Sequence, residues 1–332
     1  MKQTSGKLLF SIAVHEKPET IVDQIENILT FNPNSLIVLH ISKQFSDKSK
    51  YLAPDAFYSY LNNNPNVYIN DQRLSTSKYS PGQTHCSNFL YASKKIKLAF
   101  DYFVLLNSND LFIKPGFANQ IGSADYGIEA RKYTKHWAHY KAATMDDFTK
   151  TVIKNNSLDN LCLSYLEGTF FARHLFSKIC DALVSAGIFT SKMNYPQDEL
   201  TIPSLAKKIG GKEDNFRAIK NGNLDLFVNL KTIKQALKDP LKFGVKRIDR
   251  DFDDPYRIYI RERISKTTGK ISQIIALQDS DKQLKGLYFY NFRETLKQVT
   301  LFCVKRIIWA FAGKKRYKKI KEKYLSKKTK KS

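Results

Sequence analysis

The chain has 332 residues, of which 42% are hydrophobic and 13% aromatic, so it has enough apolar side chains for a sizeable core. Its 22 Phe and 18 Tyr exclude a wholly disordered chain, and only 14 Gly and 10 Pro exclude collagen-like and low-complexity classes. The 55 basic and 31 acidic residues give a net charge of +24. Such a surplus indicates an anionic partner: nucleic acid, a phosphorylated substrate or an acidic membrane.

Much of the positive charge lies at the end of the chain. Residues 305–331 contain thirteen Lys or Arg and one acidic residue, which is half of the net charge. Aromatic and aliphatic side chains between 302 and 311 lie among these cations, a pattern that suits an anionic membrane surface. Nucleic-acid binding and a merely solvated tail are the alternatives. We predict a globular domain at 1–265 and a basic, helical, membrane-associating region at 266–332.

The cysteines and the apolar segments indicate the cellular compartment of the protein. No run of 18 apolar residues is present, and the apolar stretch at 8–14 is too short and lacks the cleavage site of a signal peptide. The cysteines are far apart and have no zinc-type spacing, so we expect buried free thiols in a reducing compartment. They are Cys86, Cys162, Cys180 and Cys303. A cytoplasmic protein is therefore predicted.

The first part of the chain alternates between strands and helices. Lys7–Val14 and Ser35–Ile41 are apolar runs typical of buried strands, and the segment between them, beginning at Pro18, has isoleucines at helical spacing. This pattern predicts a βαβ unit with parallel strands. A third strong strand is predicted at Asp101–Leu106. Further predictions are a strand at 66–69, a helix at 85–100, a strand at 165–171, and helices at 174–186 and from 199 through 205 towards Gly210-Gly211.

Polar side chains follow each of the three strong strands. They are His15, Ser42 with Lys43, and Asn107–Asp110. In open parallel sheets, ligands bind beyond the carboxyl ends of the strands, so these residues are candidates for a site.

Ser108-Asn109-Asp110 stands where an Asp-x-Asp motif would chelate Mn²⁺ or Mg²⁺ together with a diphosphate. Only the second carboxylate is present, and one carboxylate makes a weak divalent site. The alternative interpretation is a turn in which Asp110 caps the next element.

A group of cations later in the chain is also open to two interpretations. They either form ion pairs with neighbouring acids or clamp a diphosphate, replacing a metal by neutralising charge on a leaving phosphate. The cations are Lys246, Arg247, Arg250, Arg257 and Arg261.

Asp198 and Glu199 follow a proline at the predicted start of a helix. Acidic residues are favoured in the first helical turn, which alone could explain the pair. A carboxylate there could instead act as a general base on a substrate hydroxyl.

Five segments carry a resemblance to a known family: His15–Pro18, Val38–Lys43, Tyr102–Asp110, Tyr195–Glu199 and Phe243–Asp249. In this order they resemble the core-2/I-branching β-1,6-N-acetylglucosaminyltransferase family and its bacterial relatives, which are metal-independent GT-A glycosyltransferases. The likeness covers roughly residues 7–255.

The resemblance implies an inverting transfer in which an acceptor hydroxyl attacks C1 of a nucleotide sugar. It implies that Glu199 is the catalytic base and that Lys246, with Arg247, holds the diphosphate in place of a metal. On the same basis His15, Ser42 and Asp110 belong to the donor side, and Glu167, Thr169 and Asp198 to the acceptor and sugar side. The sequence departs from the family pattern at Ser42, where the family has an aspartate near the nucleoside, and after Asp110, where its proline is missing.

We therefore expect an α/β enzyme with a GT-A-like, Rossmann-type, mainly parallel sheet flanked by helices, and a basic helical C-terminal extension. It is expected to move a sugar, N-acetylglucosamine being one candidate, from a UDP-sugar to a glycan or lipid-linked glycan without a divalent metal. Surface polysaccharide or lipopolysaccharide synthesis would suit a protein that binds the inner face of the membrane through residues 300–332. Nucleic acid is not an expected partner. The alternatives are a basic nucleic-acid-binding protein and a metal-dependent transferase of another GT-A family.

Overall fold

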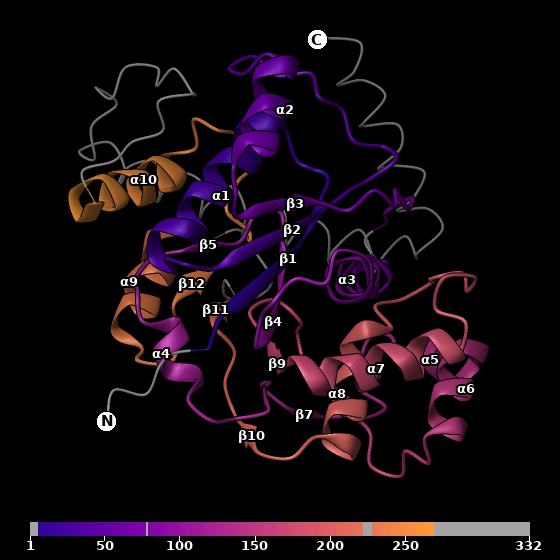
Figure 1. Ribbon diagram of the computed structural model, residues 1–332. Helices are drawn as coiled ribbons and strands as arrows, with labels where there is room; N and C mark the ends of the chain where they lie inside the picture. The colour runs from indigo at the N-terminus through magenta and orange to yellow at the C-terminus, as the bar shows by residue number, and fades with distance from the viewer. Residues whose placement is uncertain (1–5, 78, 222–227, 269–332) are drawn as a thin grey trace, which may run out of the picture. The chain divides into compact units, whose positions relative to one another are not determined.

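The structure is a computed structural model that describes residues 6–77, 79–221 and 228–268. All of these lie in the first of two compact units of the chain, residues 1–278. The architecture is mixed α/β, with a mainly parallel central sheet flanked by helices (Figure 1). The predicted fold class is confirmed for this part of the chain. The predicted basic extension after residue 268, with Cys303, lies outside the described residues.

The central sheet has seven strands in the order β10-β6-β9-β4-β1-β2-β3. Strands β1 (Leu8–Val14), β2 (Leu36–Ile41), β3 (Val67–Ile69) and β4 (Tyr102–Asn107) are parallel neighbours. Strand β9 (Phe170–Ala172) is antiparallel to both β4 and β6 (Tyr126–Gly127), and β10 (Glu213–Asp214) pairs in parallel with β6. The predicted βαβ unit is confirmed, with helix α1 (Pro18–Phe31) between β1 and β2.

Every residue of β1 and β2 is buried because helices cover both faces of the sheet. On one face, Ser11 of β1 hydrogen-bonds His85 of α3 (Pro81–Leu90) at 2.8 Å. On the other face, Phe10 of β1 packs against Phe112 of β5 (Leu111–Phe112), with ring centroids 5.6 Å apart, and α1 lies beside β5. Figure 1 shows α1 and α3 on opposite sides of the strands.

Three predicted boundaries need correction. The helix predicted at 85–100 begins at Pro81, because proline lacks an N–H and suits the first helical position, and it ends in a π-helical turn, η1 (Tyr91–Lys95). The strand predicted at 165–171 is shortened to β9 by a turn at Gly168. Helix α8 (Asp198–Ile209) begins one residue before Glu199 and ends just before Gly210, as predicted.

A smaller sheet, in the order β11-β12-β5, lies beside the main one. Strand β12 (Gly244–Val245) is parallel to β11 (Ile219–Lys220) and antiparallel to β5. Lys246 follows β12 directly, and its N–H donates to the carbonyl of Lys220 at 3.0 Å. This sheet therefore fixes the backbone from which the Lys246 side chain projects.

Gly168 allows the chain to turn sharply just after Glu167. Its φ of +78° lies in the left-handed region, and a Cβ there would come within 2.4 Å of the Ile219 nitrogen. The Gly168 N–H donates to Leu105 O, and its carbonyl accepts from Ala218 N, both at 2.8 Å. A side chain at this position would displace the loop that carries Glu167.

The remaining helices and strands surround the sheets. They are α2 (Pro54–Asn63), α4 (Phe117–Ile121), β7 (Arg131–Lys132), α5 (Tyr140–Met145), α6 (Asp147–Asn155), β8 (Cys162–Leu163), α7 (Arg173–Ser185), α9 (Leu230–Lys238) and α10 (Pro255–Thr268). Helix α10 continues across residue 265, where the first predicted region ends. None of the helices within the described ranges combines the length and hydrophobicity needed to cross a bilayer. Cys86, Cys162 and Cys180 are free and buried, as predicted.

Candidate active site

An open cavity of about 680 Å³ lies at the carboxyl ends of the parallel strands. His15 follows β1, Ser42 follows β2, and Asn107 ends β4; all three line the cavity. The strand register brings them together, because Val14 pairs with Ile41 and Ala13 with Asn107. Polar side chains predicted from the strand ends thus meet at one edge of the sheet.

A buried ion pair forms one wall of this cavity. The Lys246 ammonium donates to Oε1 of Glu167, and the Asn107 side-chain amide donates to the same oxygen at 2.7 Å. Burial alone would raise the pKa of Glu167, but Lys246 and then Arg217 outweigh it and lower that pKa to about 2. Glu167 is therefore a carboxylate at neutral pH, and it holds the ammonium at the cavity wall.

Three cationic side chains lie around the ring of Tyr165. Lys246 Nζ lies 5.5 Å from the ring centroid, and the guanidinium carbons of Arg131 and Arg217 lie at 4.0 Å and 5.2 Å. Such cation–π contacts are favourable, and they keep cations close to one another despite their like charge. Arg217 also donates to the Glu167 carbonyl at 3.0 Å and to Glu129 Oε2 at 3.0 Å. Three cations thus surround the Tyr165 ring, and of these only Lys246 was predicted from the sequence to belong to the site.

Asp198 and Glu199, at the start of α8, line the same cavity. Glu199 is half-buried, and its backbone carbonyl accepts from Ser164 N at 3.0 Å. No side-chain cap is formed by Gln197, the residue before the helix. The helix start therefore fixes the backbone of Glu199 while its side chain borders the cavity.

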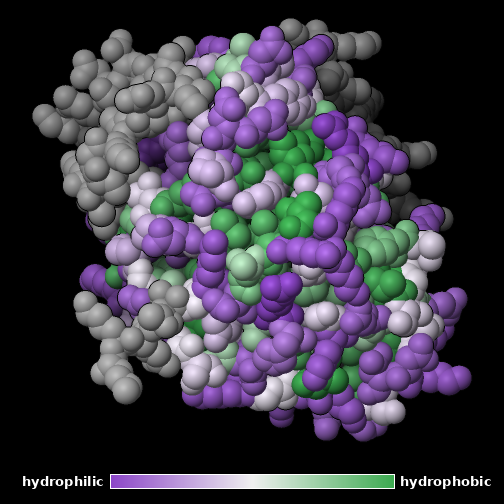
Figure 2. All heavy atoms as spheres, in the orientation of Figure 1, coloured by the Kyte–Doolittle hydropathy of each residue, from purple (hydrophilic) through white to green (hydrophobic). Residues whose placement is uncertain are grey.

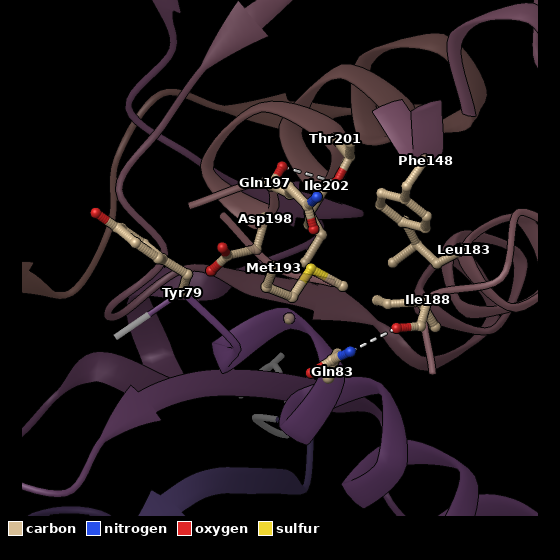
Figure 3. A pocket seen from close by; sticks show the side chains of 11 residues that line it. Tyr79, Gln83, Phe148, Leu183, Ile188, Met193, Gln197, Asp198, Thr201 and Ile202 are labelled. Atoms are coloured by element: carbon tan, nitrogen blue, oxygen red, sulfur yellow. Dashed lines mark hydrogen bonds between the residues drawn. The ribbon is translucent and has the colours of Figure 1, made fainter. Parts of the chain in front are cut away.

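Asp198 lies between the large cavity and a second, small one of about 10 Å³, close to the lower limit for one water molecule. Figure 3 shows its carboxylate on the side of Tyr79, with Phe148, Leu183 and Ile188 on the other side. Burial, and after it the neighbouring Glu199, raise the pKa of Asp198 well above its usual value. Within the described residues its Oδ1 has no hydrogen-bond partner.

Asp110 is fully buried and is not among the residues that line the cavity. Its Oδ2 accepts from the Asn107 N–H at 2.8 Å, so it closes the turn after β4. The turn agrees with one of the two interpretations, but the bond is to the end of β4 and does not cap the next element. Burial raises the pKa of Asp110 to about 8, and nearby Glu167 adds to this effect. Thr169 is likewise buried away from the cavity, where its hydroxyl donates to Leu166 O at 2.7 Å.

The donor-side candidates His15 and Ser42 have different surroundings. His15 lies 3.3 Å from Oε1 of buried Glu16, which also pairs with Arg250 at 3.1 Å. Burial lowers the pKa of His15, and the Glu16 carboxylate opposes this effect. Ser42 donates to Gln44 Oε1 and accepts from the Thr76 hydroxyl, both at 2.7 Å.

The structure divides the cation group at 246–261. Lys246, Arg247 and Arg250 line the cavity. Arg257 is completely buried and pairs with Asp23 at 2.5 Å, while Arg261 lies over the Phe252 ring at 3.8 Å. The first three thus have the position of an anion clamp, whereas Arg257 and Arg261 belong to a structural network. Arg247 has a φ of +70°, which turns the chain between Lys246 and Arg250.

Several lining residues were missed from the sequence. Gln44, Thr76, Tyr79 and His139 come from loops without a recognisable motif, and only the fold brings them to the strand ends. His85, on helix α3, also lines the cavity. Burial lowers the pKa of His85 to about 3, so it is neutral at pH 7.

Divalent-metal chemistry requires a group of suitable ligands. Within the described ranges, no three His, Cys, Asp or Glu side chains are arranged to hold a metal ion. Ser108 occupies the first position of the Asp-x-Asp place, and Asp110 is committed to the turn. These residues do not fit the usual bridge between a metal and a diphosphate.

About half of the chain is similar in sequence to a known protein. No family profile matches the chain. A stretch of 167 residues, 48% of the chain, is 28% identical to the chondroitin synthase of Pasteurella multocida (strain Pm70). This stretch corresponds to only 16% of the length of that protein.

Solved structures of sugar transferases are also similar, at low scores. The mannosyltransferase PcManGT from Pyrobaculum calidifontis, in complex with GDP-Man and Mn²⁺, has a TM-score of 0.40 and 10% identity over 81% of this chain and 66% of its own. The galactosyltransferase LgtC, with donor and acceptor sugar analogues, has a TM-score of 0.38 and 9% identity over 80% of this chain and 98% of its own. For the mannosyltransferase Ktr4p from S. cerevisiae the values are 0.31 and 12%, over 60% and 68%. Scores this low do not transfer a substrate or a metal requirement.

Proposed function

We propose that this chain is a glycosyltransferase that moves a sugar from a nucleotide-sugar donor to a hydroxyl group of a glycan acceptor. One observation carries the proposal: a single cavity at the carboxyl ends of the parallel strands is lined by both a carboxylate, Glu199, and a buried ammonium, Lys246. The stretch similar to chondroitin synthase supports the same class of reaction.

The reaction would be one inverting displacement. Glu199 accepts the proton of the acceptor hydroxyl as its oxygen bonds to C1 of the donor sugar. The bond between C1 and the phosphate oxygen breaks with its electron pair going to the nucleoside diphosphate. Lys246, supported by Arg247 and Arg250, neutralises the negative charge that develops on this leaving group. Because Lys246 is already held by Glu167, little reorganisation accompanies the charge transfer.

The proposed chemistry needs no divalent metal. Ser108 and the turn-bound Asp110 do not supply the two carboxylates of a metal bridge, and the cations at 246–250 take the place of the metal charge. Assays in excess EDTA are expected to retain full activity. Restoration by Mn²⁺ of activity lost in EDTA would instead assign the chain to a metal-dependent type.

Glu199→Gln is the principal test. We expect transfer to fall by at least about a hundredfold, since a positioned base contributes roughly 10²–10⁴-fold, while UDP still raises the thermal midpoint as in the wild type. Asp159→Asn is the matched control, because Asp159 is an exposed carboxylate whose side chain is 83% accessible. Undiminished transfer by Glu199→Gln would remove Glu199 as the base.

The finer features of the proposal rest on the resemblance to the core-2/I-branching family. They are a UDP-sugar donor, with N-acetylglucosamine as one candidate, and a role in surface polysaccharide or lipopolysaccharide synthesis. A thermal-shift panel of nucleotides in EDTA tests the donor: a shift with UDP and not with GDP, ADP or CMP supports it. A larger shift with GDP would replace UDP and would leave the transferase proposal intact.

We further propose that residues 300–332 attach the protein to the inner, anionic face of a membrane, as a cytoplasmic peripheral enzyme. The support is the run of basic residues among aromatic ones in this segment. Truncation after Lys285 is expected to abolish sedimentation with vesicles containing anionic lipid, while UDP still shifts the thermal midpoint. Unchanged sedimentation of the truncated protein would exclude this segment as the anchor.

A further inference from the structure

The segment 131–141 has an unusual composition, and we call it the basic aromatic segment. No acidic residue occurs between Glu129 and Asp146. The basic aromatic segment itself combines four Lys or Arg and two His with three aromatic residues. They are Arg131, Lys132, Lys135, Lys141, His136, His139, Tyr133, Trp137 and Tyr140.

The cations of this segment lie in solvent. Lys132, Lys135 and Lys141 are exposed, and within the described part of the chain no ion pair engages them. Arg131 is also exposed, and its guanidinium lies over the ring of Tyr165, which Lys246 approaches from within the cavity wall. Positive charge therefore continues from the candidate diphosphate clamp onto this surface.

The aromatic side chains form a continuous row. Trp137 contacts Tyr133 at 5.8 Å and His139 at 5.5 Å between ring centroids. The ring of fully buried Tyr195 packs against that of Trp137, with centroids 5.9 Å apart, and its hydroxyl hydrogen-bonds the Thr149 hydroxyl. The row therefore rests on the core, and its half-buried outer rings are held in place before any ligand arrives.

This row leads into the large cavity. His139 contacts Tyr79 at 6.0 Å, and both residues line the cavity together with Pro196 and Glu199. The end of a ligand that lies along the rings would thus reach Glu199, the candidate base. In Figure 2 the surface at lower right, where Figure 1 shows α5 and α6, is mainly hydrophilic with smaller hydrophobic areas between.

We propose that the basic aromatic segment binds an acidic glycan acceptor, one whose sugars carry carboxylates, and directs its end into the cavity. This inference rests on the proposed transferase function. Pyranose rings present apolar faces that pack on aromatic side chains, and exposed cations attract carboxylates along the same chain. The row is continuous with the cavity that Glu199 lines, and a glycan acceptor must place its terminal sugar there. Binding of a nucleic acid does not require a chain end in this cavity, so the arrangement favours a sugar chain.

Binding can be measured without turnover. Isothermal titration would compare an oligosaccharide of alternating glucuronic acid and N-acetylhexosamine with the same oligosaccharide after reduction of its carboxyl groups. We expect the wild type to bind the acidic form about tenfold more tightly, since three or four exposed ion pairs contribute modestly each. Raising the salt concentration should remove most of this preference.

A triple variant tests the cations directly. Lys132→Ala, Lys135→Ala and Lys141→Ala together should remove the preference for the acidic ligand and leave affinity for the reduced ligand within about twofold. The matched control replaces Lys178, Lys231 and Lys238 with Ala; these lysines are exposed on α7 and α9 and lie outside the cavity lining. The control should bind like the wild type.

The aromatic row has its own variant. Trp137→Ala should weaken both ligands roughly fivefold, whereas Trp137→Phe should keep most of the affinity. Thermal unfolding of both variants identifies any loss of folding. Equal affinity of the wild type for the acidic and reduced ligands, or binding of neither, would overturn the proposal. Tighter binding of single-stranded RNA than of the acidic ligand, lost in the triple lysine variant, would overturn it in favour of a nucleic-acid surface.

These outcomes are distinct from failure of the transferase proposal. That proposal fails if wild-type protein shows no shift with any nucleotide and no transfer from any nucleotide sugar. The basic aromatic segment fails by its own ligand comparison, even in a protein whose response to nucleotides and dependence on Glu199 are as expected.

Discussion

Lys246 and Asn107 donate to the same oxygen, Oε1 of Glu167, and both donors belong to elements that meet only in the folded chain. Asn107 ends β4 of the main sheet, and Lys246 follows β12 of the smaller sheet. Glu167 is held between them by the turn at Gly168. The two sheets are thus joined at the cavity wall through one carboxylate.

Removing one partner of this buried ion pair is expected to be costly. Lys246→Met leaves Glu167 as a buried carboxylate without its ammonium partner and should destabilise the protein by roughly 3 kcal/mol in urea unfolding. The double variant Lys246→Met/Glu167→Gln has no buried charge at the pair and should recover most of this loss. Neither variant should show the rise in thermal midpoint with UDP that the wild type shows. A double variant as unstable as Lys246→Met would show that the pair contributes net stability beyond charge balance.

The same pair predicts a loss of stability in acid. The pKa of Glu167 is about 2 in the folded protein and 4.5 when unperturbed, so the unfolded state binds its proton first as the pH falls. The stabilisation is therefore fully present above about pH 4.5 and disappears as the pH approaches 2. Comparing thermal midpoints at pH 6 and pH 3 should show a steeper fall for the wild type than for Lys246→Met/Glu167→Gln. Parallel falls would contradict the assignment.

Asp110→Asn separates a turn residue from a ligand residue. The folded pKa of Asp110 is about 8, above its unperturbed 3.8, so its burial costs progressively more stability as the pH rises between these values. An Asn side chain can still accept from the Asn107 N–H, and it removes the charge. We expect the variant to gain stability over the wild type at pH 8 relative to pH 5 and to retain transfer activity within about threefold. If the variant instead loses activity and added Mn²⁺ changes that loss, Asp110 would be a metal ligand.

The sequence was sufficient to predict the parallel βαβ core and the polar strand ends, because the runs at 8–14 and 36–41 are apolar on both faces and are followed directly by His15 and Ser42. It could not predict Arg217 or Tyr165 as parts of the site. Neither lies in a motif, and Arg217 and Lys246 meet at the Tyr165 ring only in the folded chain. The second carboxylate at 198 was predicted, but its burial between two cavities depends on packing against α3: a Cβ on Gly82 would lie 2.8 Å from Cβ of Asp198.

Asp198 predicts a limit to activity on the high-pH side. Burial, and after it the neighbouring Glu199, raise the pKa of Asp198 well above its usual value, so its protonated form persists to a higher pH than that of an exposed aspartate. Its ionisation as the pH rises would place a second negative charge beside the candidate base. The rate of transfer should therefore decline as Asp198 ionises in the wild type, and the decline should be smaller in Asp198→Asn. A pH–rate profile of Asp198→Asn identical to the wild type would exclude Asp198 as the titrating group.

Gly168→Ala tests how closely the loop of Glu167 is packed. Two penalties are expected: the left-handed φ of +78°, which costs roughly 1 kcal/mol for alanine, and a Cβ only 2.4 Å from the Ile219 nitrogen. The control is Gly116→Ala, where φ is also positive at +103° in the left-handed region but the nearest atom is 3.5 Å away. Urea unfolding should show a loss of about 1 kcal/mol for the control and at least twice that for Gly168→Ala, because only the latter also forces the backbone apart. Since that movement shifts Glu167 from Lys246, the thermal shift with UDP should weaken in Gly168→Ala and not in Gly116→Ala. Equal losses in the two variants would mean that the loop yields without disturbing the ion pair.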